Sequence, residues 1–309
     1  MKDATFWLPP QASTLAPDLD GVFYFIYWVD VVFLVLLMGA TALFTIQYRQ
    51  RTVQDKTHPT QGSHKLEFIW AFIPTLLSIA MFVMGFQVYI DSSVPPADSM
   101  DVRVIGQKWS WSYDYGNGVV TDTLKVPRDT NVRLTMNSRD VLHSYYVPDF
   151  RIKKDVIPNR YTVLWFNAPA AGKHQVFCTE FCGDAHSAML STVEVMEGEA
   201  YTSWMQGEVE SSKTLTGAAL GEKLFATNCV ACHTTDGTKK VGPALNGLYG
   251  KQEQLADGTS VKVDDNYLRE SITLPAAKIV AGYPPAMTPF AHLKDAEVDG
   301  LIDYLMGLE

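Results

Sequence analysis

The chain has 309 residues, enough for more than one domain, and a formal net charge of −9 at pH 7. This acidic balance argues against nucleic acid as a partner. The four cysteines of the sequence all fall in two short motifs, so none is left for a separate structural disulfide.

Two apolar runs near the N-terminus predict membrane-spanning helices. Residues 22–46 carry a single charge and residues 68–90 carry none. Each run is long enough to cross the hydrocarbon core of a bilayer, which is about 30 Å thick. We therefore expect an external N-terminal arm over residues 1–21, then a transmembrane helix hairpin over residues 22–92 with a loop at 48–66. The alternative, two buried helices of a soluble core, does not account for the basic loop between the runs.

The basic residues predict how the hairpin is oriented. Loop 48–66 contains four of them: Arg49, Arg51, Lys56 and Lys65. The N-terminal arm contains only Lys2. By the positive-inside rule the loop is cytoplasmic. We expect a multi-pass protein of the bacterial inner membrane, in contact with lipid, with both termini and all later domains on the periplasmic or external side.

Residues 93–206 predict a β-rich domain. Short runs rich in β-branched and aromatic residues alternate with turn signals. These runs lie at residues 102–105, 119–120, 124–126, 132–136 and 161–166. Several short strands separated by turns are typical of a sandwich or a small barrel.

The first cysteine motif lies near the end of this domain and reads Cys178-Thr-Glu-Phe-Cys182-Gly-Asp-Ala-His186-Ser-Ala-Met189. Thiolate, imidazole and thioether ligands together are typical of copper electron-transfer sites. A further ligand has to come from elsewhere, and His143, in a strand-like run, is the candidate. A Cys178–Cys182 disulfide is the alternative that an oxidising compartment allows. It would leave the nearby histidine and methionine without a role.

The second cysteine motif follows a change in composition. The polar segment 207–216 predicts a linker, and residues 217–309 predict a separate helical domain. Its motif, Cys229-Val-Ala-Cys232-His233, is the attachment signature of c-type haem. Two thioether bonds would hold the porphyrin, and His233 would bind the iron. A thioredoxin-type redox pair is the alternative, but it needs a βαβ context that the sequence does not predict.

The sixth iron ligand is expected to be Met287. This residue lies in a proline-framed loop, Tyr283-Pro-Pro-Ala-Met287-Thr-Pro. The loop resembles the one that carries the distal iron ligand in small cytochromes c, and this resemblance implies the role of Met287. The other candidate, Met306, belongs to the predicted closing helix, where we expect it to be part of the core. Histidine–methionine ligation suits electron transfer because it raises the potential of the iron.

The first motif carries a close family resemblance. Residues 22–205 resemble subunit II of haem–copper cytochrome c oxidases through six residues: His143, Cys178, Glu180, Cys182, His186 and Met189. The resemblance implies a dinuclear copper A centre. The two cysteines would bridge two copper ions, the two histidines would be terminal ligands, and the methionine and the Glu180 carbonyl would be weak ligands. The resemblance also implies that the Glu180 side chain helps to hold a magnesium ion at the boundary with subunit I.

Two further residues match positions of that family. Trp109 lies where the family has its electron-entry residue; alternating aromatic side chains that fill a core are the alternative, which we expect for Trp111 and Tyr113. Glu67 lies at the start of the second span, where the family has a glutamate at the mouth of a proton-uptake channel. An ordinary helix cap at the membrane surface is the alternative for Glu67.

With the haem motif included, the resemblance extends to subunit II of caa3-type oxidases, which carries a fused cytochrome c. It implies a multidomain membrane protein with a two-helix hairpin, a cupredoxin-like β-sandwich or barrel (the copper A domain), and an all-α class I cytochrome c domain. Such a chain is a subunit of an oxidoreductase. It passes electrons from an external donor through covalent haem c and copper A to haem a of subunit I, where oxygen is reduced to water with proton pumping.

The partners implied by the resemblance are subunits I and III and an external electron donor. That donor is a soluble or membrane-bound cytochrome c, a bc1 complex or another quinol-oxidising complex. Two other functions remain open. A nitric oxide or nitrous oxide reductase also uses copper A, although the two spans and Glu67 favour the oxidase. A copper carrier or assembly protein has no use for a covalent haem, and quinol oxidase subunits lack the copper ligands that are intact here.

Overall fold

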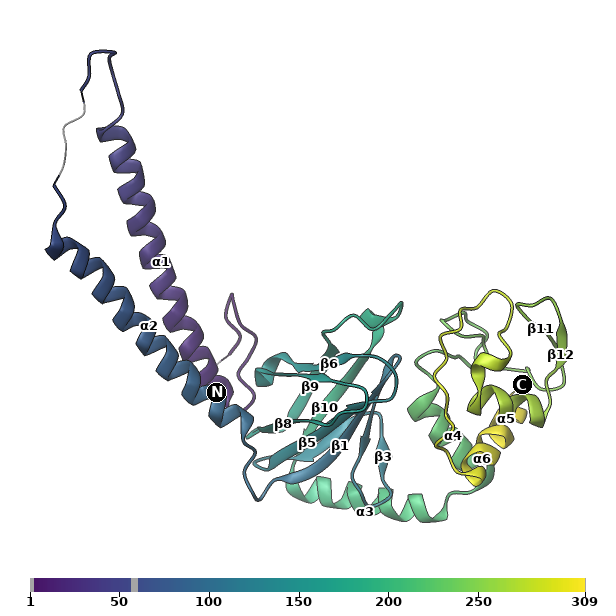
Figure 1. Ribbon diagram of the computed structural model, residues 1–309. Helices are drawn as coiled ribbons and strands as arrows, with labels where there is room; N and C mark the ends of the chain where they lie inside the picture. The colour runs from purple at the N-terminus through teal and green to yellow at the C-terminus, as the bar shows by residue number, and fades with distance from the viewer. Residues whose placement is uncertain (1–2, 57–60, 309) are drawn as a thin grey trace. The chain divides into compact units, whose positions relative to one another are not determined.

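The computed structural model describes residues 3–56 and 61–308 (Figure 1). The expected N-terminal arm and the expected loop 48–66 each include residues outside these ranges. The chain divides into two compact units, one formed by Leu15–Val94 and the other by the N-terminal arm together with everything from Pro95 onwards. The order of elements confirms the predicted fold class: two apolar helices, then a β-sandwich, then a helical domain.

The first unit consists of helices α1 (Ala16–Gln47) and α2 (His64–Ser93). Both are long and apolar enough to cross a membrane, and the most apolar part of each is not buried. The hydroxyls of Thr41, Thr45 and Thr75 each donate a 2.7 Å hydrogen bond to the main-chain oxygen four residues earlier. The helices therefore satisfy these polar groups internally, as lipid surroundings require.

Residues 100–196 form two five-stranded sheets. The first has the order β3-β2-β1-β5-β8 and consists of β1 (Met100–Gln107), β2 (Ser110–Asp114), β3 (Val120–Thr121), β5 (Asn131–Ser138) and β8 (Thr162–Asn167). The second has the order β4-β10-β9-β6-β7 and consists of β4 (Leu124–Pro127), β6 (His143–Val147), β7 (Ile152–Val156), β9 (Gly172–Cys178) and β10 (Leu190–Met196). Two 3-10 turns, η1 (Pro148–Phe150) and η2 (His186–Ala188), interrupt the connections of the second sheet.

The sandwich core follows from the period-2 pattern of the strands. In β5 the buried residues Val132, Leu134 and Met136 alternate with partly exposed ones, so a single face of the strand is covered. Trp111 and Tyr113 of β2 are among the largest fully buried side chains. The core role expected for these two aromatic residues is therefore confirmed.

The N-terminal arm packs on the β-sandwich. The main-chain N–H groups of Ala12 and Thr14 donate to the oxygens of Asp149 and Asn167, both at 2.9 Å. The hydroxyl of Ser13 donates to the oxygen of Phe150 at 2.8 Å. The arm and the sandwich must therefore lie on the same side of any membrane that α1 and α2 cross.

The segment expected to be a linker is mostly helical. Helix α3 (Gly198–Thr214) contains residues 207–214 of that segment. The ring of Trp204 packs at 5.6 Å from the rings of both Tyr115 and Tyr201, and the Lys125 ammonium lies 5.1 Å from its centroid. Tertiary packing at this residue anchors a helix whose second half has weak helix-forming residues.

The C-terminal domain is built around helices α4 (Gly217–Asn228), α5 (Asp265–Thr273) and α6 (Asp295–Met306). A two-stranded hairpin of β11 (Gln252–Gln254) and β12 (Ser260–Lys262) and a 3-10 turn, η3 (Pro275–Ala277), complete it. Helices α4 and α6 cross closely at two glycines, because a Cβ built on Gly221 would lie 1.9 Å from the oxygen of Gly300. Met306, expected in the core, is instead 45% exposed, since the buried face of α6 presents other residues.

Candidate metal and haem centres

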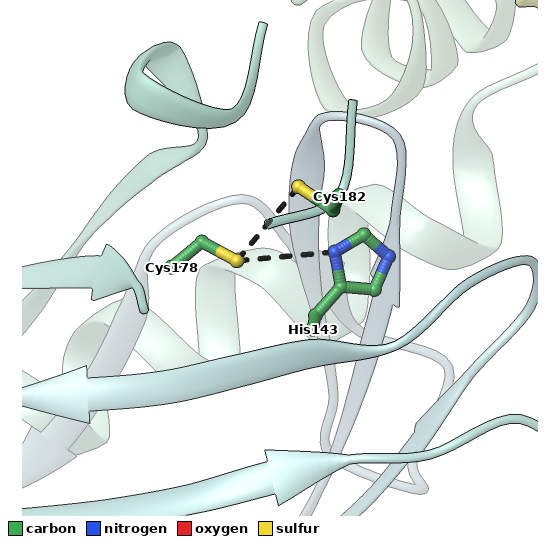
Figure 2. A group of neighbouring side chains, drawn as sticks. All are labelled: His143, Cys178 and Cys182. Carbon is green, nitrogen blue, oxygen red and sulfur yellow. Dashed lines mark hydrogen bonds between the residues drawn. The ribbon is translucent and has the colours of Figure 1, made fainter. Parts of the chain in front are cut away.

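The second sheet gathers the first cysteine motif around His143. Strands β6 and β9 are neighbours in this sheet, and His143 begins β6 while Cys178 ends β9. The chain then loops through Cys182 to His186 in η2 and Met189 just after it. Figure 2 shows the Cys178 sulfur facing both the His143 ring and the Cys182 sulfur. Strand pairing thus joins His143 to the thiol of Cys178, which is 35 residues later in the chain.

Each of the two sulfurs has an imidazole nitrogen and a weaker donor beside it. Cys178 Sγ lies 4.0 Å from His143 Nδ1 and 3.3 Å from the main-chain oxygen of Glu180. Cys182 Sγ lies 3.4 Å from His186 Nδ1 and 3.8 Å from Met189 Sδ. The sulfurs themselves are 3.8 Å apart, and both cysteines are free. This donor set fits two soft metal ions that share both sulfurs.

The sulfur pair is buried, and the pKa values of its two thiols shift in opposite directions. His143 and Met189 are fully buried, and the two cysteines nearly so. Burial opposes ionisation of Cys178, but hydrogen bonds from His143 and from main-chain N–H groups outweigh it and lower its pKa. Burial and the charge of that first thiolate raise the pKa of Cys182. A bound cation would be needed to hold both sulfurs as thiolates.

Asp140 belongs to this candidate site, although neither cysteine motif predicts it. Its Oδ1 lies 2.9 Å from His143 Nε2, the ring nitrogen that faces away from Cys178. The main-chain N–H groups of Lys108 and Val141 donate to the same carboxylate at 2.8 and 2.7 Å. Despite its burial, these bonds lower the pKa of Asp140 to about 2. An acidic residue three positions before a candidate ligand was the available signal, since carboxylates commonly orient ligating histidines.

Trp109 lies directly against the motif loop. Its indole is buried, and Nε1 donates to the main-chain oxygen of Cys182 at 3.2 Å. A Cβ on Gly183, whose φ is +117°, would approach the indole at 3.1 Å, so this position needs glycine. Trp109 is therefore both a buried aromatic residue of the sandwich and a hydrogen-bond donor to a residue of the sulfur cluster.

The two glutamates with expected roles lie in different units. The main-chain oxygen of Glu180 lies 3.3 Å from the Cys178 sulfur, and the side chain of Glu180 is partly exposed. Glu67 lies in the first turn of α2, where its carboxylate is 3.1 Å from His64 Nδ1. The N-cap of α2 is Ser63, whose hydroxyl accepts from the N–H of Leu66. Glu67 is thus not the residue that caps the helix with its side chain.

The second cysteine motif lines a cavity of the C-terminal domain. Cys229, Cys232, His233 and Met287 all face this cavity, which is otherwise walled mainly by apolar side chains of α4, α5 and the intervening loops. Its walls include Phe225, Leu245, Tyr267, Leu268, Ile279 and Phe290. A large, mainly apolar ligand suits such a cavity.

His233 is oriented as an iron ligand would be. Its Nδ1 donates to the main-chain oxygen of Pro243 at 2.8 Å, which directs the other ring nitrogen away from this carbonyl. Burial lowers the pKa of His233 and so favours the neutral imidazole, the form that binds metal. A Cβ on Gly242 would lie 2.5 Å from the ring, so only glycine leaves room for it here. Met287 lines the cavity, whereas Met306 is absent from the lining residues.

Three family models match the sequence, each over a different part. Residues 2–88 match "Cytochrome C oxidase subunit II, transmembrane domain", and residues 118–196 match "Cytochrome C oxidase subunit II, periplasmic domain". Residues 218–309 match "Cytochrome c". Together these matches extend over the apolar helices, most of the sandwich and the whole C-terminal domain.

Individual relatives agree with the family models. Cytochrome c oxidase subunit 2 of Alkalihalophilus pseudofirmus is 28% identical over 97% of this chain and 89% of its own length. Cytochrome c oxidase subunit 2 of Synechocystis is 27% identical over 64% of this chain and 74% of its own length. Among solved structures, the periplasmic domain of subunit II of cytochrome oxidase of Bradyrhizobium japonicum is 26% identical, with a TM-score of 0.36, over 38% of this chain and 99% of that domain.

Proposed function

Because the chain belongs to the cytochrome c oxidase subunit II family and ends in a cytochrome c domain, we propose that it is the electron-input subunit of a caa3-type oxidase. Electrons from an external donor would pass through haem c to a dinuclear copper A centre and then to haem a of subunit I. Subunit I would reduce oxygen to water and pump protons, and subunit III would complete the core complex.

Six residues would hold the copper pair. Cys178 and Cys182 would bridge the ions, His143 and His186 would be terminal ligands, and Met189 and the Glu180 carbonyl would be weak ligands. The single observation that carries the proposal is the arrangement of these donors, with one imidazole and one weaker donor beside each sulfur. When bound, the copper pair and the haem iron would each accept and release one electron. The buried surroundings exclude water and would limit reorganisation during transfer.

The haem would be held by four residues of the C-terminal domain. Cys229 and Cys232 would form thioether bonds to the porphyrin, His233 would bind the iron, and Met287 would be the sixth ligand. The shared cavity and the hydrogen bond from His233 to Pro243 support this assignment. Trp109 would be the electron-entry residue of the copper domain, which its bond to Cys182 supports.

The topology proposed for the complex is periplasmic at both termini, in the bacterial inner membrane, with the loop between α1 and α2 in the cytoplasm. The packing of the N-terminal arm on the sandwich supports the placement of both on one side. Glu67 would then lie on the cytoplasmic side, at a proton-uptake channel. The Glu180 side chain would help to bind a magnesium ion at the boundary with subunit I.

Metal and haem analysis of the purified intact complex tests this proposal. We expect two copper ions in the copper A centre and one covalent haem c for each copy of this chain. Oxygen and nitric oxide should be compared as electron acceptors of the same preparation. Reduction of nitric oxide without oxygen reduction would place the chain in a nitric oxide reductase instead.

A further inference from the structure

The C-terminal domain touches the copper domain at the residues that surround both proposed centres. The hydroxyl of Thr288 donates to Asp140 Oδ2 at 3.0 Å, across 148 residues of sequence. Thr288 directly follows Met287, and Asp140 contacts His143 through its other oxygen. A single carboxylate therefore bridges the residue next to a proposed haem ligand and a proposed copper ligand.

A second contact joins the same two regions. The main-chain N–H of Trp109 lies near enough to the sulfur of Cys232 to favour its thiolate, which partly offsets the burial that raises the pKa of this thiol. In a haem-loaded chain the same sulfur would be a thioether of the porphyrin, which remains a weak acceptor. In addition, Gln107 and Lys108 line the cavity that contains Cys232 and Met287. The haem cavity is thus bordered by the strand end that leads into Trp109.

The connecting helix restricts how far the C-terminal domain can move. Trp204 anchors the first half of α3 on the sandwich. The second half of α3 is joined to α4 by an ion pair of 2.8 Å between Glu208 and Lys223. Only Leu215 and Thr216 lie between the two helices. A tether of this kind holds the C-terminal domain at a high effective concentration beside the sandwich, which favours the contacts between them.

We propose that Thr288 and Asp140 form a latch that keeps the cytochrome c domain docked on its own copper domain, with Cys232 against Trp109. This inference rests on the proposed function. One electron would leave the ferrous haem iron, making it ferric, and reduce the copper pair; no bond forms or breaks. Asp140 acts as a positioning residue. The docked face is closed to other proteins, so an external donor has to approach the cytochrome c domain on another side.

The test is hydrogen–deuterium exchange of the intact, detergent-purified complex, followed in peptides that contain Lys108 and Trp109. The N–H of Lys108 donates to Asp140 at 2.8 Å, and the N–H of Trp109 lies near the Cys232 sulfur. Thr288→Val removes the latch hydroxyl and leaves the Asp140–His143 contact in place. Loss of a hydrogen bond to a charged group should speed exchange of the Trp109 peptide by roughly tenfold. Thr288→Ser keeps the hydroxyl and should exchange as the parent does.

Thr259→Val is the matched control. Its hydroxyl also donates to an aspartate, Asp257 Oδ1, at 2.7 Å, but within the C-terminal domain. This variant should leave exchange at Trp109 unchanged. Parent-like exchange in Thr288→Val would overturn the latch. Exchange does not depend on turnover, so this outcome is distinct from failure of the proposed function, which would appear as missing copper or haem in the parent complex.

Discussion

The indole Nε1 of Trp109 donates a 3.2 Å hydrogen bond to the main-chain oxygen of Cys182, which is 73 residues later in the chain. This bond fixes the aromatic ring against the loop that carries the sulfur cluster. The main-chain N–H of the same residue lies near the sulfur of Cys232. Trp109 therefore contacts residues of both proposed redox centres.

Replacing Trp109 with Phe should slow electron transfer from haem c to copper while both centres remain loaded. The variant keeps an aromatic ring but loses the bond to Cys182, at a cost of about 1 kcal/mol in stability. Flash-induced reduction of haem c, followed by the copper absorption, measures the rate. Trp111→Phe is the control, because Trp111 is buried in the sandwich core and packs edge-on against the ring of His143, 5.9 Å away, and the variant keeps an aromatic ring there. Equal rates of electron transfer from haem c to copper in the two variants would contradict the role proposed for Trp109.

Replacing Asp140 with Asn should weaken copper binding by about 10- to 100-fold, the usual effect of losing a carboxylate that orients a ligating histidine. The amide retains the size of the side chain but not its charge. Competition with a copper chelator measures the affinity. Asp122→Asn is a suitable control, since Asp122 lies outside the sulfur cluster. Unchanged copper retention in the Asp140 variant would show that His143 needs no such partner.

Replacing Cys182 with Ser should abolish the copper absorption and stop electron input to the oxidase, because one of the two shared sulfurs is lost. Haem c should remain, since its cysteines lie in the other motif. The reduced haem spectrum and the copper content of one preparation measure both effects. Retention of the copper absorption would contradict the assignment of the sulfur cluster as the copper A site.

Replacing Gly221 with Ala should destabilise the C-terminal domain by roughly 3 kcal/mol or more, because the new methyl group would collide with the main chain at Gly300.

Replacing Gly207 with Ala should instead stabilise the protein. Gly207 lies inside α3 with open space around its Cα, so alanine should stabilise this helix by about 1 kcal/mol. Thermal unfolding of the two variants, followed by the haem absorption, compares these effects. A lower melting temperature for Gly207→Ala would contradict the helical assignment of this segment.

The sequence predicted those features that are concentrated in short segments. Five of the six residues proposed to hold copper lie within one 12-residue motif, and the cysteines and histidine proposed to attach the haem lie within another. The expected strands and the two apolar spans followed from period and composition. Contacts between distant parts of the chain could not be predicted in this way. Thr288 and Asp140 are 148 residues apart, and the sequence around either residue does not indicate the other.

The segment 207–216 shows that local composition can predict the wrong conformation. Its glycine, serine and threonine residues favour an irregular linker by local propensity. In the structure it continues a helix that is anchored earlier, at Trp204, so tertiary packing decides its conformation. Local composition therefore predicted a flexible connection where the fold provides a helical one.

The most direct test of the central claim is electron paramagnetic resonance of the oxidised, intact complex, combined with its copper and haem c content. The proposal predicts two copper ions in the copper A centre for each haem c, and a hyperfine pattern of one unpaired electron shared between two copper nuclei. This pattern should be absent in Cys182→Ser. A single isolated copper signal in the parent complex, or no copper bound by this chain, would contradict the account.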